Sequence, residues 1–479
     1  MMSMRNLTMM TDLYQLTMMQ GYLHHGMQNN RACFDLFYRK RGDIMAYAVA
    51  AGLEQAIEYV QNLRFTEDDI AYLRSLAIFD EDFMDYLRNF HFTGEILAVP
   101  EGTIVFPNEP IVRVTAPVME AQLLETALLN IINHQTLIAT KAARVVQAAR
   151  GDTVLEFGLR RAQGPDAGIY GARAAIIGGC QATSNVLTGQ MFSIPIGGTH
   201  AHSWVMSFPD ELTAFRAYAD VFPTNCLLLV DTYDTLGSGV PNAITVFKEL
   251  RQRGFEPKGI RLDSGDLAFL SRQARRMLDD AGFPNAQICA SGDLDEEVIW
   301  DLKAQGAAID IWGVGTKMIT SMDNPALGGV YKLAAEESNG QFVPRIKVSE
   351  NPAKVTNPGV KQLYRFYDRI TGKALVDLIA LDDEDYSSGE PFEVFDPENT
   401  WKRMTLCEYR VRKLLVPIFE NGQLVYTMPH LSEIAEYART EMDSFWDEYR
   451  RLTRPHRYKV DLSEKLYNLK HSLLSNRKR

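Results

Sequence analysis

Between about residue 150 and residue 314, short apolar runs alternate with longer segments of helical periodicity, and this alternation constrains the fold more than any other feature. The short runs consist of β-branched or other apolar residues, and two of the longer segments end near a glycine, as helices commonly do. Strands that alternate with helices form a parallel sheet that is buried on both faces. The expected strands are residues 153–157, 192–196, 226–230, 258–262, 287–290 and 309–314.

Six such repeats in so short a stretch favour a closed or nearly closed barrel over an open doubly wound sheet. Each flank mixes helical periodicity with a few strand-like runs, and neither has enough strands for a sheet of its own. We therefore expect an α/β fold: an irregular parallel α/β barrel plus an α+β domain built from both the N- and C-terminal flanks. The expected boundaries are 1–140 for the N-terminal part of the α+β domain, 141–340 for the barrel with the active site, and 341–479 for the C-terminal part with a helical tail.

Composition excludes several classes of function. The chain has 50 Lys and Arg against 61 Asp and Glu, and its net charge of −11 is a poor match to the phosphate backbone of a nucleic acid. The five cysteines are scattered, with no C-x-x-C pair, so we expect neither a disulfide framework nor a structural zinc site. A reducing cytoplasm fits this cysteine usage.

No membrane partner is expected either. No stretch approaches the ~20 apolar residues that cross a bilayer, and the methionine-rich start is interrupted by Asp12 and Gln15. The basic amphipathic segment 465–479 is expected to be a solvated final helix, because one short cationic end binds membranes only weakly. Within the C-terminal flank, Asn421-Gly422 between two strand-like runs predicts a hairpin turn.

Polar residues follow every expected strand. In a parallel α/β barrel the active site gathers at the carboxyl ends of the strands, so these segments are the candidates for chemistry. Their side chains suit a phosphate group, a metal ion or an anionic substrate. In chain order the segments are GLRRAQGPDAG, GGTHAHSW, DTYDT, DSGD, SGDLDE and GVGTKM.

A phosphate site is expected after the last two strands, where barrel enzymes often bind phosphate through backbone N–H groups. The alternative is that the glycines there only form turns and that Asp293 with Glu296 caps a helix. The candidate residues are Ser291, Gly292, Gly313, Gly315 and Thr316, with Lys317 as an added charge.

The neighbouring acidic loops contain Asp231, Asp234, Asp263 and Asp266. Carboxylates would repel a phosphate unless Mg²⁺ lies between them, so these loops predict a magnesium-bound polyphosphate, with Asp231 and Asp263 as candidate ligands. Each aspartate could instead cap the helix that follows it, and we expect this of one or two of the four.

The GGTHAHSW loop supplies His200 and His202. The pair suggests zinc, but no further ligand follows at the usual spacing, so a base, a phosphate acceptor or a structural histidine is the better interpretation. Because alternate residues of an extended chain point to opposite sides, only one of the two can face the barrel mouth. Arg160, Arg161 and Arg261 lie at strand ends, where a guanidinium can hold a carboxylate or a phosphate with two hydrogen bonds.

These loops, in this order, resemble the nicotinate phosphoribosyltransferase family, of the bacterial type within the type II phosphoribosyltransferase superfamily. The resemblance spans roughly the first three quarters of the chain and extends into the C-terminal flank, whereas the last part adds little. It rests on TDLYQLTM (11–18), FDLFYRK (34–40), EFGLRRAQGPDA (156–167), GGTHAHSW (197–204), LLVDTYDT (228–235), GIRLDSGDL (259–267), GVGT (313–316), GGVYKL (328–333) and KVSENPAKVTNPGVKQLYR (347–365).

The resemblance implies that nicotinate reacts with phosphoribosyl pyrophosphate to give nicotinate mononucleotide and pyrophosphate, in NAD biosynthesis or salvage. It implies ATP as a co-substrate that is hydrolysed through a transient phosphohistidine, Mg²⁺ as the metal, and no permanently bound organic cofactor. It also implies a cytoplasmic homodimer with shared active sites. The competing interpretations are the nicotinamide-using sister enzyme and a non-catalytic barrel that binds phosphorylated metabolites.

By the same resemblance, His202 is the phosphorylated histidine, and Asp231 and Arg160 are further active-site residues. Asp231 is expected to orient the His202 imidazole by a hydrogen bond. Tyr14 packs on the nicotinate ring in the neighbouring subunit.

The remaining implied contacts divide between the two substrates. Thr199 and Arg261 contact nicotinate, with the guanidinium paired to the carboxylate. Gly315 and Thr316 hold the ribose 5-phosphate.

Overall fold

The computed structural model describes residues 6–39 and 46–476. The chain divides into two compact units, one made of residues 1–137 and 326–479 and the other of residues 138–325. The sequence-based boundaries were 140 and 340. Lys40 of the FDLFYRK segment, the first five residues, and the last three residues of the basic tail lie outside the described residues.

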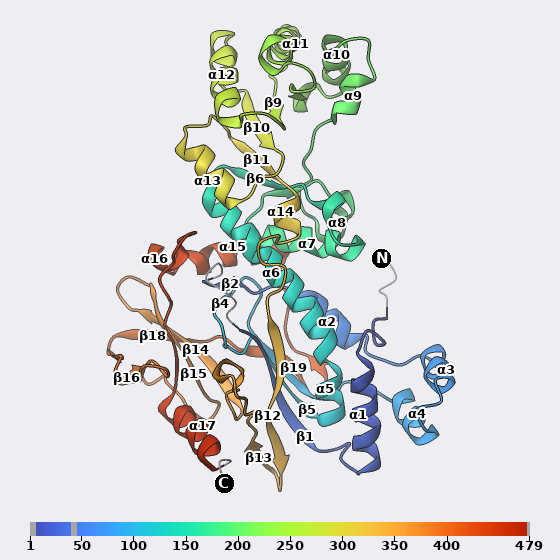
Figure 1. The fold of residues 1–479 in the computed structure, drawn as a ribbon, viewed down its shortest axis with the longest axis vertical. Helices are drawn as coiled ribbons and strands as arrows, with labels where there is room; N and C mark the ends of the chain where they lie inside the picture. The colour runs from blue at the N-terminus through green and yellow to red at the C-terminus, as the bar shows by residue number, and fades with distance from the viewer. Residues whose placement is uncertain (1–5, 40–45, 477–479) are drawn as a thin grey trace. The chain divides into compact units, whose positions relative to one another are not determined.

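The unit of residues 138–325 is built on one six-stranded sheet in which every pair of neighbours is parallel. Its strand order is β7-β6-β11-β10-β9-β8, so strands that are far apart in the chain lie next to one another. Helices follow the strands, as the alternation in the sequence predicts (Figure 1). The strands are β6 Thr153–Glu156, β7 Ala182–Thr183, β8 Leu227–Leu229, β9 Gly259–Leu262, β10 Gln287–Ser291 and β11 Ile311–Val314.

Several helices of this unit begin at an aspartate that accepts a hydrogen bond from the backbone N–H three residues later, as at Asp266 and Asp295. The 3₁₀ turn Leu159–Arg161 follows β6. The α-helices are α7 Pro165–Ile177, α8 Val186–Phe192, α9 His202–Met206, α10 Glu211–Val221, α11 Val240–Gln252, α12 Leu267–Asp280, α13 Glu296–Ala304 and α14 Thr316–Ile319.

The expected strand at 192–196 is wrong. Phe192 is the last residue of α8, and Ser193 ends that helix in the left-handed conformation with φ 54°. Ile196 forms only an isolated parallel bridge to Thr183, and the strand next to β6 at this edge of the sheet is β7, which was not among the expected strands. Among the described residues no ladder joins β7 to β8, so the structure establishes a parallel α/β sheet, and its closure into a barrel stays a prediction.

The other unit contains two larger sheets. A seven-stranded sheet has the order β13-β12-β1-β5-β3-β19-β20, and a four-stranded sheet has the order β18-β14-β15-β21. Its strands are β1 Arg31–Tyr38, β2 Ala48–Val49, β3 Glu95–Ala98, β4 Ile104–Val105, β5 Val112–Pro117, β12 Gly329–Ser338, β13 Gln341–Pro344, β14 Lys361–Asp368, β15 Ala374–Leu381, β16 Phe392–Phe395, β17 Arg403–Leu406, β18 Tyr409–Lys413, β19 Val416–Glu420, β20 Gln423–Leu424 and β21 Val460–Leu462.

Helices accompany these sheets, and no helix among the described residues is both long enough and apolar enough to span a membrane. The predicted hairpin is confirmed: Asn421 and Gly422 connect β19 to β20 with φ angles of 49° and 74°. The helices are α1 Leu13–His24, α2 Leu53–Gln61, α3 Glu67–Ser75, α4 Glu81–Arg88, α5 Val118–Leu123, α15 Leu431–Asp443, α16 Asp447–Arg450 and α17 Glu464–Asn476, together with α6 Glu125–Ala149, whose residues divide between the two units.

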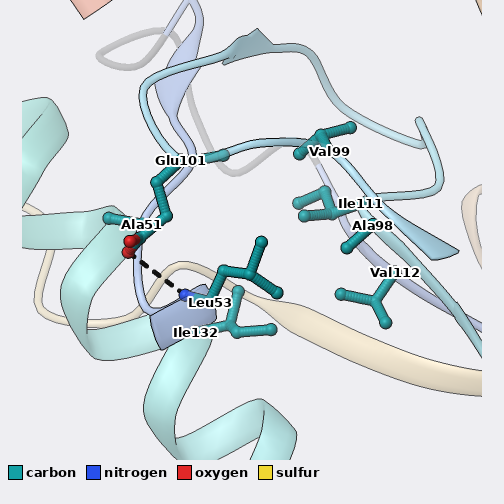
Figure 2. A pocket seen from close by; sticks show the side chains of 9 residues that line it. Ala51, Leu53, Ala98, Val99, Glu101, Ile111, Val112 and Ile132 are labelled. Atoms are coloured by element: carbon teal, nitrogen blue, oxygen red, sulfur yellow. Dashed lines mark hydrogen bonds between the residues drawn. The ribbon is translucent and has the colours of Figure 1, made fainter. Parts of the chain in front are cut away.

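A small cavity in the core of this unit is a packing gap rather than a binding site. Its volume is about 10 Å³, which is room for about one water molecule. At its edge, Glu101 Oε1 accepts a hydrogen bond from the backbone N–H of Leu53 at 3.1 Å (Figure 2). The same oxygen accepts the backbone N–H of Gly52 at 2.6 Å, so the carboxylate caps the start of α2.

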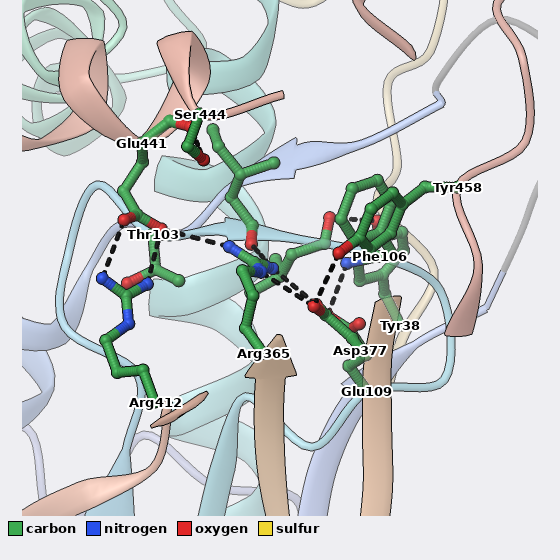
Figure 3. A network of polar contacts seen from close by, with 12 residues as sticks. Tyr38, Thr103, Phe106, Glu109, Arg365, Asp377, Arg412, Glu441, Ser444 and Tyr458 are labelled. Atoms are coloured by element: carbon green, nitrogen blue, oxygen red, sulfur yellow. Dashed lines mark hydrogen bonds and ion pairs between the residues drawn. The ribbon is translucent and has the colours of Figure 1, made fainter. Parts of the chain in front are cut away.

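A buried polar network connects β14, β15 and α15 (Figure 3). Arg365 is completely buried, and its Nε and Nη2 donate to the two carboxylate oxygens of Asp377 at 2.8 and 2.5 Å. Its Nη1 donates to Glu441 at 3.1 Å, and Glu441 also accepts two hydrogen bonds from Arg412 at 2.8 and 2.7 Å. Tyr458 donates its hydroxyl to Asp377 at 3.0 Å. The charges of this core are therefore matched by specific partners.

We predict that Asp377→Ala lowers the free energy of unfolding by about 3–5 kcal/mol, because it leaves a buried guanidinium without its main counter-ion. The control is Glu436→Ala on α15, which removes an exposed ion pair with Arg439 and is expected to change stability little. Urea denaturation of both variants measures the difference. Equal stability of the two variants would contradict the prediction.

Candidate active site

The order of the parallel strands places the carboxyl ends of β6, β11, β10 and β9 side by side. Leu262 at the end of β9 pairs with Ala290, Ser291 at the end of β10 pairs with Gly313, and Val314 at the end of β11 pairs with Glu156. Residues that follow these positions can therefore contact one another although they are far apart in the sequence.

Arg261, Asp263 and Ser291 form the centre of this cluster. Arg261 Nε donates to Ser291 Oγ at 2.7 Å, and Nη2 donates to Asp263 Oδ1 at 2.7 Å. The Ser291 hydroxyl donates to the same Asp263 oxygen. A third, longer hydrogen bond runs from Arg261 Nη1 to Thr199 Oγ1 at 3.4 Å. Three strand-end loops thus hold one guanidinium.

The Asp263 carboxylate is stabilised in its charged form. Burial alone would raise its pKa, but the hydrogen bond from Ser291 and the charge and hydrogen bond of Arg261 together lower it. Asp263 is therefore an anion at neutral pH, and its charge is balanced within the protein.

Asp231 connects the loops after β8 and β9. Its Oδ2 accepts the backbone N–H of Asp263 at 3.0 Å and the hydroxyl of Ser264 at 2.6 Å. Its Oδ1 is buried and accepts no hydrogen bond from the described residues. An unsatisfied buried carboxylate oxygen is unusual, and a bound cation is one of the groups that can complete it.

His202 begins α9 and lies at the same edge of the sheet. Its Nδ1 is 3.1 Å from Thr232 Oγ1, and its Nε2 is 3.9 Å from Asp263 Oδ2. The expectation that Asp231 orients this imidazole is wrong, because Asp231 is engaged by the β9 loop and the next residue, Thr232, makes the contact. The side chain of His202 remains 40% exposed, so the ring is open to a reactant.

His200 has a different environment from His202. It is buried, its Nε2 accepts the backbone N–H of Leu229 at 3.2 Å, and its ring packs edge-on against Tyr218. Burial lowers its pKa to about 4. His200 is therefore a neutral structural histidine at physiological pH, whereas His202 is accessible.

The four aspartates of the acidic loops divide into two roles. Asp234 accepts the backbone N–H of Gly237 at 2.9 Å and Asp266 accepts that of Phe269 at 2.9 Å, so both cap the chain that follows. Asp231 and Asp263 instead bind the loops of the cluster. This division confirms the expectation that one or two of the four act as caps.

The candidate phosphate loops follow β10 and β11. At Gly292 and Gly313 a larger residue would collide with neighbouring atoms. Gly292 has φ +89°, and a Cβ there would lie 2.3 Å from the carbonyl oxygen of Asp263. A Cβ on Gly313 would lie 2.6 Å from ring atoms of Phe157. No hydrogen bond involves the Thr316 hydroxyl among the described residues, and the backbone N–H of Gly315 likewise has no backbone partner there.

Two other expectations about these loops need correction. The residue that caps α13 is Asp295, not Asp293, which has a positive φ of 40°. Lys317 Nζ donates to Asp295 Oδ2 at 2.5 Å, and this hydrogen bond raises the pKa of Lys317. The lysine charge is therefore already paired with a carboxylate of the preceding loop.

Two candidate residues are not members of the central cluster. The Arg160 side chain is exposed in the 3₁₀ turn after β6 and makes no hydrogen bond or ion pair with the described part of the chain. Tyr14 belongs to the other unit, where it is 47% exposed on α1 and its hydroxyl donates to Glu125 Oε2 at 3.3 Å.

Sequence reasoning missed three side chains of the site. Thr232 contacts His202, Ser264 holds Asp231, and the ring of Phe157 lies 5.7 Å from the guanidinium carbon of Arg261. Thr232 and Ser264 are adjacent to residues that were singled out, and Phe157 ends an expected strand, but a single sequence gives no signal for which neighbour points inward. No group of three or more His, Cys, Asp or Glu arranged to hold a metal ion occurs over residues 6–39 and 46–476.

Comparisons with known proteins identify relatives over almost the whole chain. The model of the nicotinate phosphoribosyltransferase N-terminal domain matches residues 9–133, and that of the C-terminal domain matches residues 360–470. Over 465 residues the chain is 50% identical to the nicotinate phosphoribosyltransferase of Bacillus subtilis (strain 168), an alignment that covers 97% of this chain and 94% of the relative. The Homo sapiens nicotinate phosphoribosyltransferase is 34% identical over 523 residues, covering 97% and 96%.

Solved structures give the same result. The crystal structure of human nicotinic acid phosphoribosyltransferase superimposes with a TM-score of 0.84 at 32% identity, covering 97% of this chain and 99% of that one. The nicotinate-nucleotide pyrophosphorylase from Pyrococcus furiosus shares the fold, with a TM-score of 0.70 at 23% identity and coverage of 93% and 98%. From the full-length identity to the bacterial relative, the chain belongs to the nicotinate phosphoribosyltransferase family of enzymes.

Proposed function

We propose that this enzyme transfers the phosphoribosyl group of phosphoribosyl pyrophosphate to nicotinate, releasing pyrophosphate and supplying nicotinate mononucleotide for NAD biosynthesis in the cytoplasm. The parallel sheet would close into an irregular barrel around this site, as in other barrel enzymes. The observation that carries the proposal is the guanidinium of Arg261, held by Ser291, Asp263 and Thr199 beside the accessible His202.

The geometry of Arg261 suits a small carboxylate. Of its five N–H groups, one on Nε, one on Nη2 and one on Nη1 are used by Ser291, Asp263 and Thr199. One N–H on each of Nη1 and Nη2 remains for a ligand. They can bind both oxygens of a nicotinate carboxylate, whereas the neutral amide of nicotinamide offers only one acceptor oxygen. This favours nicotinate over nicotinamide as the base.

Magnesium would be held mainly by Asp231. Its Oδ1 is buried and unsatisfied, whereas the Oδ1 of Asp263 is already used by Arg261 and Ser291. Carboxylate oxygen is a ligand that Mg²⁺ prefers, and the ion would supply positive charge for the pyrophosphate oxygens. Asp263, the second candidate ligand, could add only its Oδ2.

Different residues of the chain would then bind the two substrates. Thr199 and Arg261 would bind nicotinate. The backbone of Ser291, Gly292, Gly313 and Gly315 and the hydroxyl of Thr316 would bind the phosphoribosyl part, with Arg160 as an additional cation. The exposed ring of Tyr14 would stack on nicotinate in the neighbouring subunit of a homodimer.

ATP would act through His202. Thr232 holds its Nδ1 side, and the ring is exposed, so the imidazole can attack the γ-phosphorus of ATP, form an N–P bond and release ADP. Hydrolysis of this phosphohistidine would return the free ring and phosphate. A phosphoryl group carries about two negative charges, and it would change the affinity of the site for its anionic substrates while the bond lasts.

We predict that the purified enzyme converts nicotinate but not nicotinamide, and that Arg261→Lys raises the KM for nicotinate by about tenfold or more while changing the KM for phosphoribosyl pyrophosphate much less. Lysine lacks the planar set of N–H groups with which a guanidinium binds a carboxylate. Chromatographic assay of the mononucleotide product measures both constants. Turnover of nicotinamide alone would overturn the proposed function, and equal changes in both KM values would assign Arg261 to the phosphates.

A second prediction is that ATP phosphorylates His202 and not His200, because His200 is buried and its Nε2 is already occupied by Leu229. The label should be lost in His202→Ala, which should retain slow transfer that does not respond to ATP. His200→Asn is the comparison variant. Alkaline phosphopeptide mapping decides between them, and a label that survives in His202→Ala would show that the assignment is wrong.

A third prediction tests the shared site. A Tyr14→Ala chain mixed with a His202→Ala chain should recover ATP-stimulated activity, because one site in each mixed dimer receives an intact tyrosine and an intact histidine. The loss in Tyr14→Ala alone should correspond to ~0.5–1.5 kcal/mol beyond the buried area of the ring. If activity in the mixture only equals the sum of the two variants measured separately, Tyr14 acts within its own subunit.

A further inference from the structure

Glu156, the last residue of β6, is completely buried and has no role in the function proposed above. Its Oε2 accepts the hydroxyl of Thr183 at 2.6 Å, and its Oε1 accepts the backbone N–H of Gly158. Thr183 is its direct neighbour on β7 in the register of the sheet. No ion pair to Glu156 occurs in the described part of the chain.

A carboxyl group in this position is costly. Burial without a cationic partner disfavours its charged form and raises its pKa. Its chain neighbour Leu155 packs against an apolar cluster of the sheet, so an apolar side chain would be the usual choice at a buried position here. The polar contacts that Glu156 makes with the chain around it therefore indicate what the side chain contributes.

Those contacts fix one turn of backbone. A Cβ on Gly158 would lie 2.4 Å from Ile319 Cβ and 2.8 Å from Glu156 Oε1, so the backbone at 158 is enclosed between the two side chains. Gly158 in turn accepts the N–H of Arg161 at 2.8 Å and begins the 3₁₀ turn Leu159–Arg161. The hydrogen bond from Gly158 to Glu156 therefore sets where this turn starts.

We propose that Glu156 is a positioning residue that fixes the 158–161 turn so that Arg160 and Arg161 face the phosphates of phosphoribosyl pyrophosphate; this inference rests on the proposed function. Both arginine side chains are exposed, and neither makes a hydrogen bond or ion pair within the described residues. Two adjacent guanidinium groups without carboxylate partners attract a polyanion. Their turn leaves a strand end next to β11, which bears the candidate phosphate loop.

The residues around Arg261, which would bind nicotinate, are held by contacts other than those of Glu156. Phe157, which lies beneath the Arg261 guanidinium, donates its backbone N–H to Val314 at 2.8 Å, and its ring packs against Gly313. Neither contact involves the Glu156 carboxyl. Loss of that carboxyl should therefore affect binding of the phosphoribosyl donor more than binding of nicotinate.

The test compares Glu156→Leu with Glu156→Gln, in the full-length enzyme with ATP and Mg²⁺. The leucine removes both hydrogen bonds, and we expect the KM for phosphoribosyl pyrophosphate to rise about tenfold or more, with the KM for nicotinate within about twofold, because a small displacement of binding groups has large effects. The glutamine keeps an acceptor for Gly158 and a polar group for Thr183, so it should restore the KM to within about threefold.

A matched pair of threonine variants covers the case in which Glu156→Leu does not fold. Thr183→Val removes one partner of Glu156, and Thr188→Val removes a buried hydroxyl of α8 that does not contact the 158–161 turn. Only Thr183→Val should raise the KM for phosphoribosyl pyrophosphate, at similar melting temperatures of the two variants.

Unchanged KM values in folded Glu156→Leu or Thr183→Val, or equal rises for both substrates, would overturn the positioning role. Either outcome is distinct from failure of the proposed function, which would appear as an inactive wild-type enzyme with nicotinate and phosphoribosyl pyrophosphate.

Discussion

The contact between the Asp263 carboxylate and the Arg261 guanidinium is the interaction on which the rest of the site depends. It is charge-assisted, it is shared with the Ser291 hydroxyl, and it balances the partly buried charges of both partners. Asp231 accepts a hydrogen bond from the backbone N–H of Asp263 and so helps to fix the position of the Asp263 residue. Without this arrangement a partly buried cation at the end of β9 and a partly buried anion in the next loop would each lack a counter-ion. With it, the site contains a guanidinium whose orientation is fixed before substrate arrives.

The parallel sheet makes this contact possible. Arg261 is the third residue of β9, whereas Ser291 ends β10, and the register of the two strands brings them to the same edge of the sheet. A shift of one residue in either strand would turn the side chains to the opposite face. Register in turn depends on the apolar residues that fill the core of the unit, of which Leu227, Cys289 and Ile311 form one cluster. Packing in the core of the sheet therefore positions the side chains of the site.

This dependence explains how much could be predicted from the sequence. The strands β9, β10 and β11 were predicted because apolar runs followed by polar loops mark both their existence and their carboxyl ends. The run 192–196 has the same composition but ends a helix, because the left-handed Ser193 breaks the extended conformation that composition alone suggests. The hydrogen-bond partners of the site residues were harder to predict. Asp231 and Thr232 are adjacent in the chain, and only their placement in three dimensions shows that Thr232 contacts His202 while Asp231 holds the neighbouring loop.

The same geometry limits how the site can accommodate additional negative charge. His202 Nε2 lies 3.9 Å from Asp263, whose own charge is already balanced by Arg261. A phosphoryl group on that ring would bring about two further negative charges to this edge of the sheet, where the charge of Arg261 is already balanced by Asp263. Lys317 does not fill this role, because it is paired with Asp295. Positive charge would have to come from a metal ion bound through Asp231 or from arginines outside the cluster. The exposed guanidinium groups of Arg160 and Arg161 in the turn after β6 would be one source of that charge, and the proposed role of the buried Glu156 carboxyl would then be to hold this turn in place.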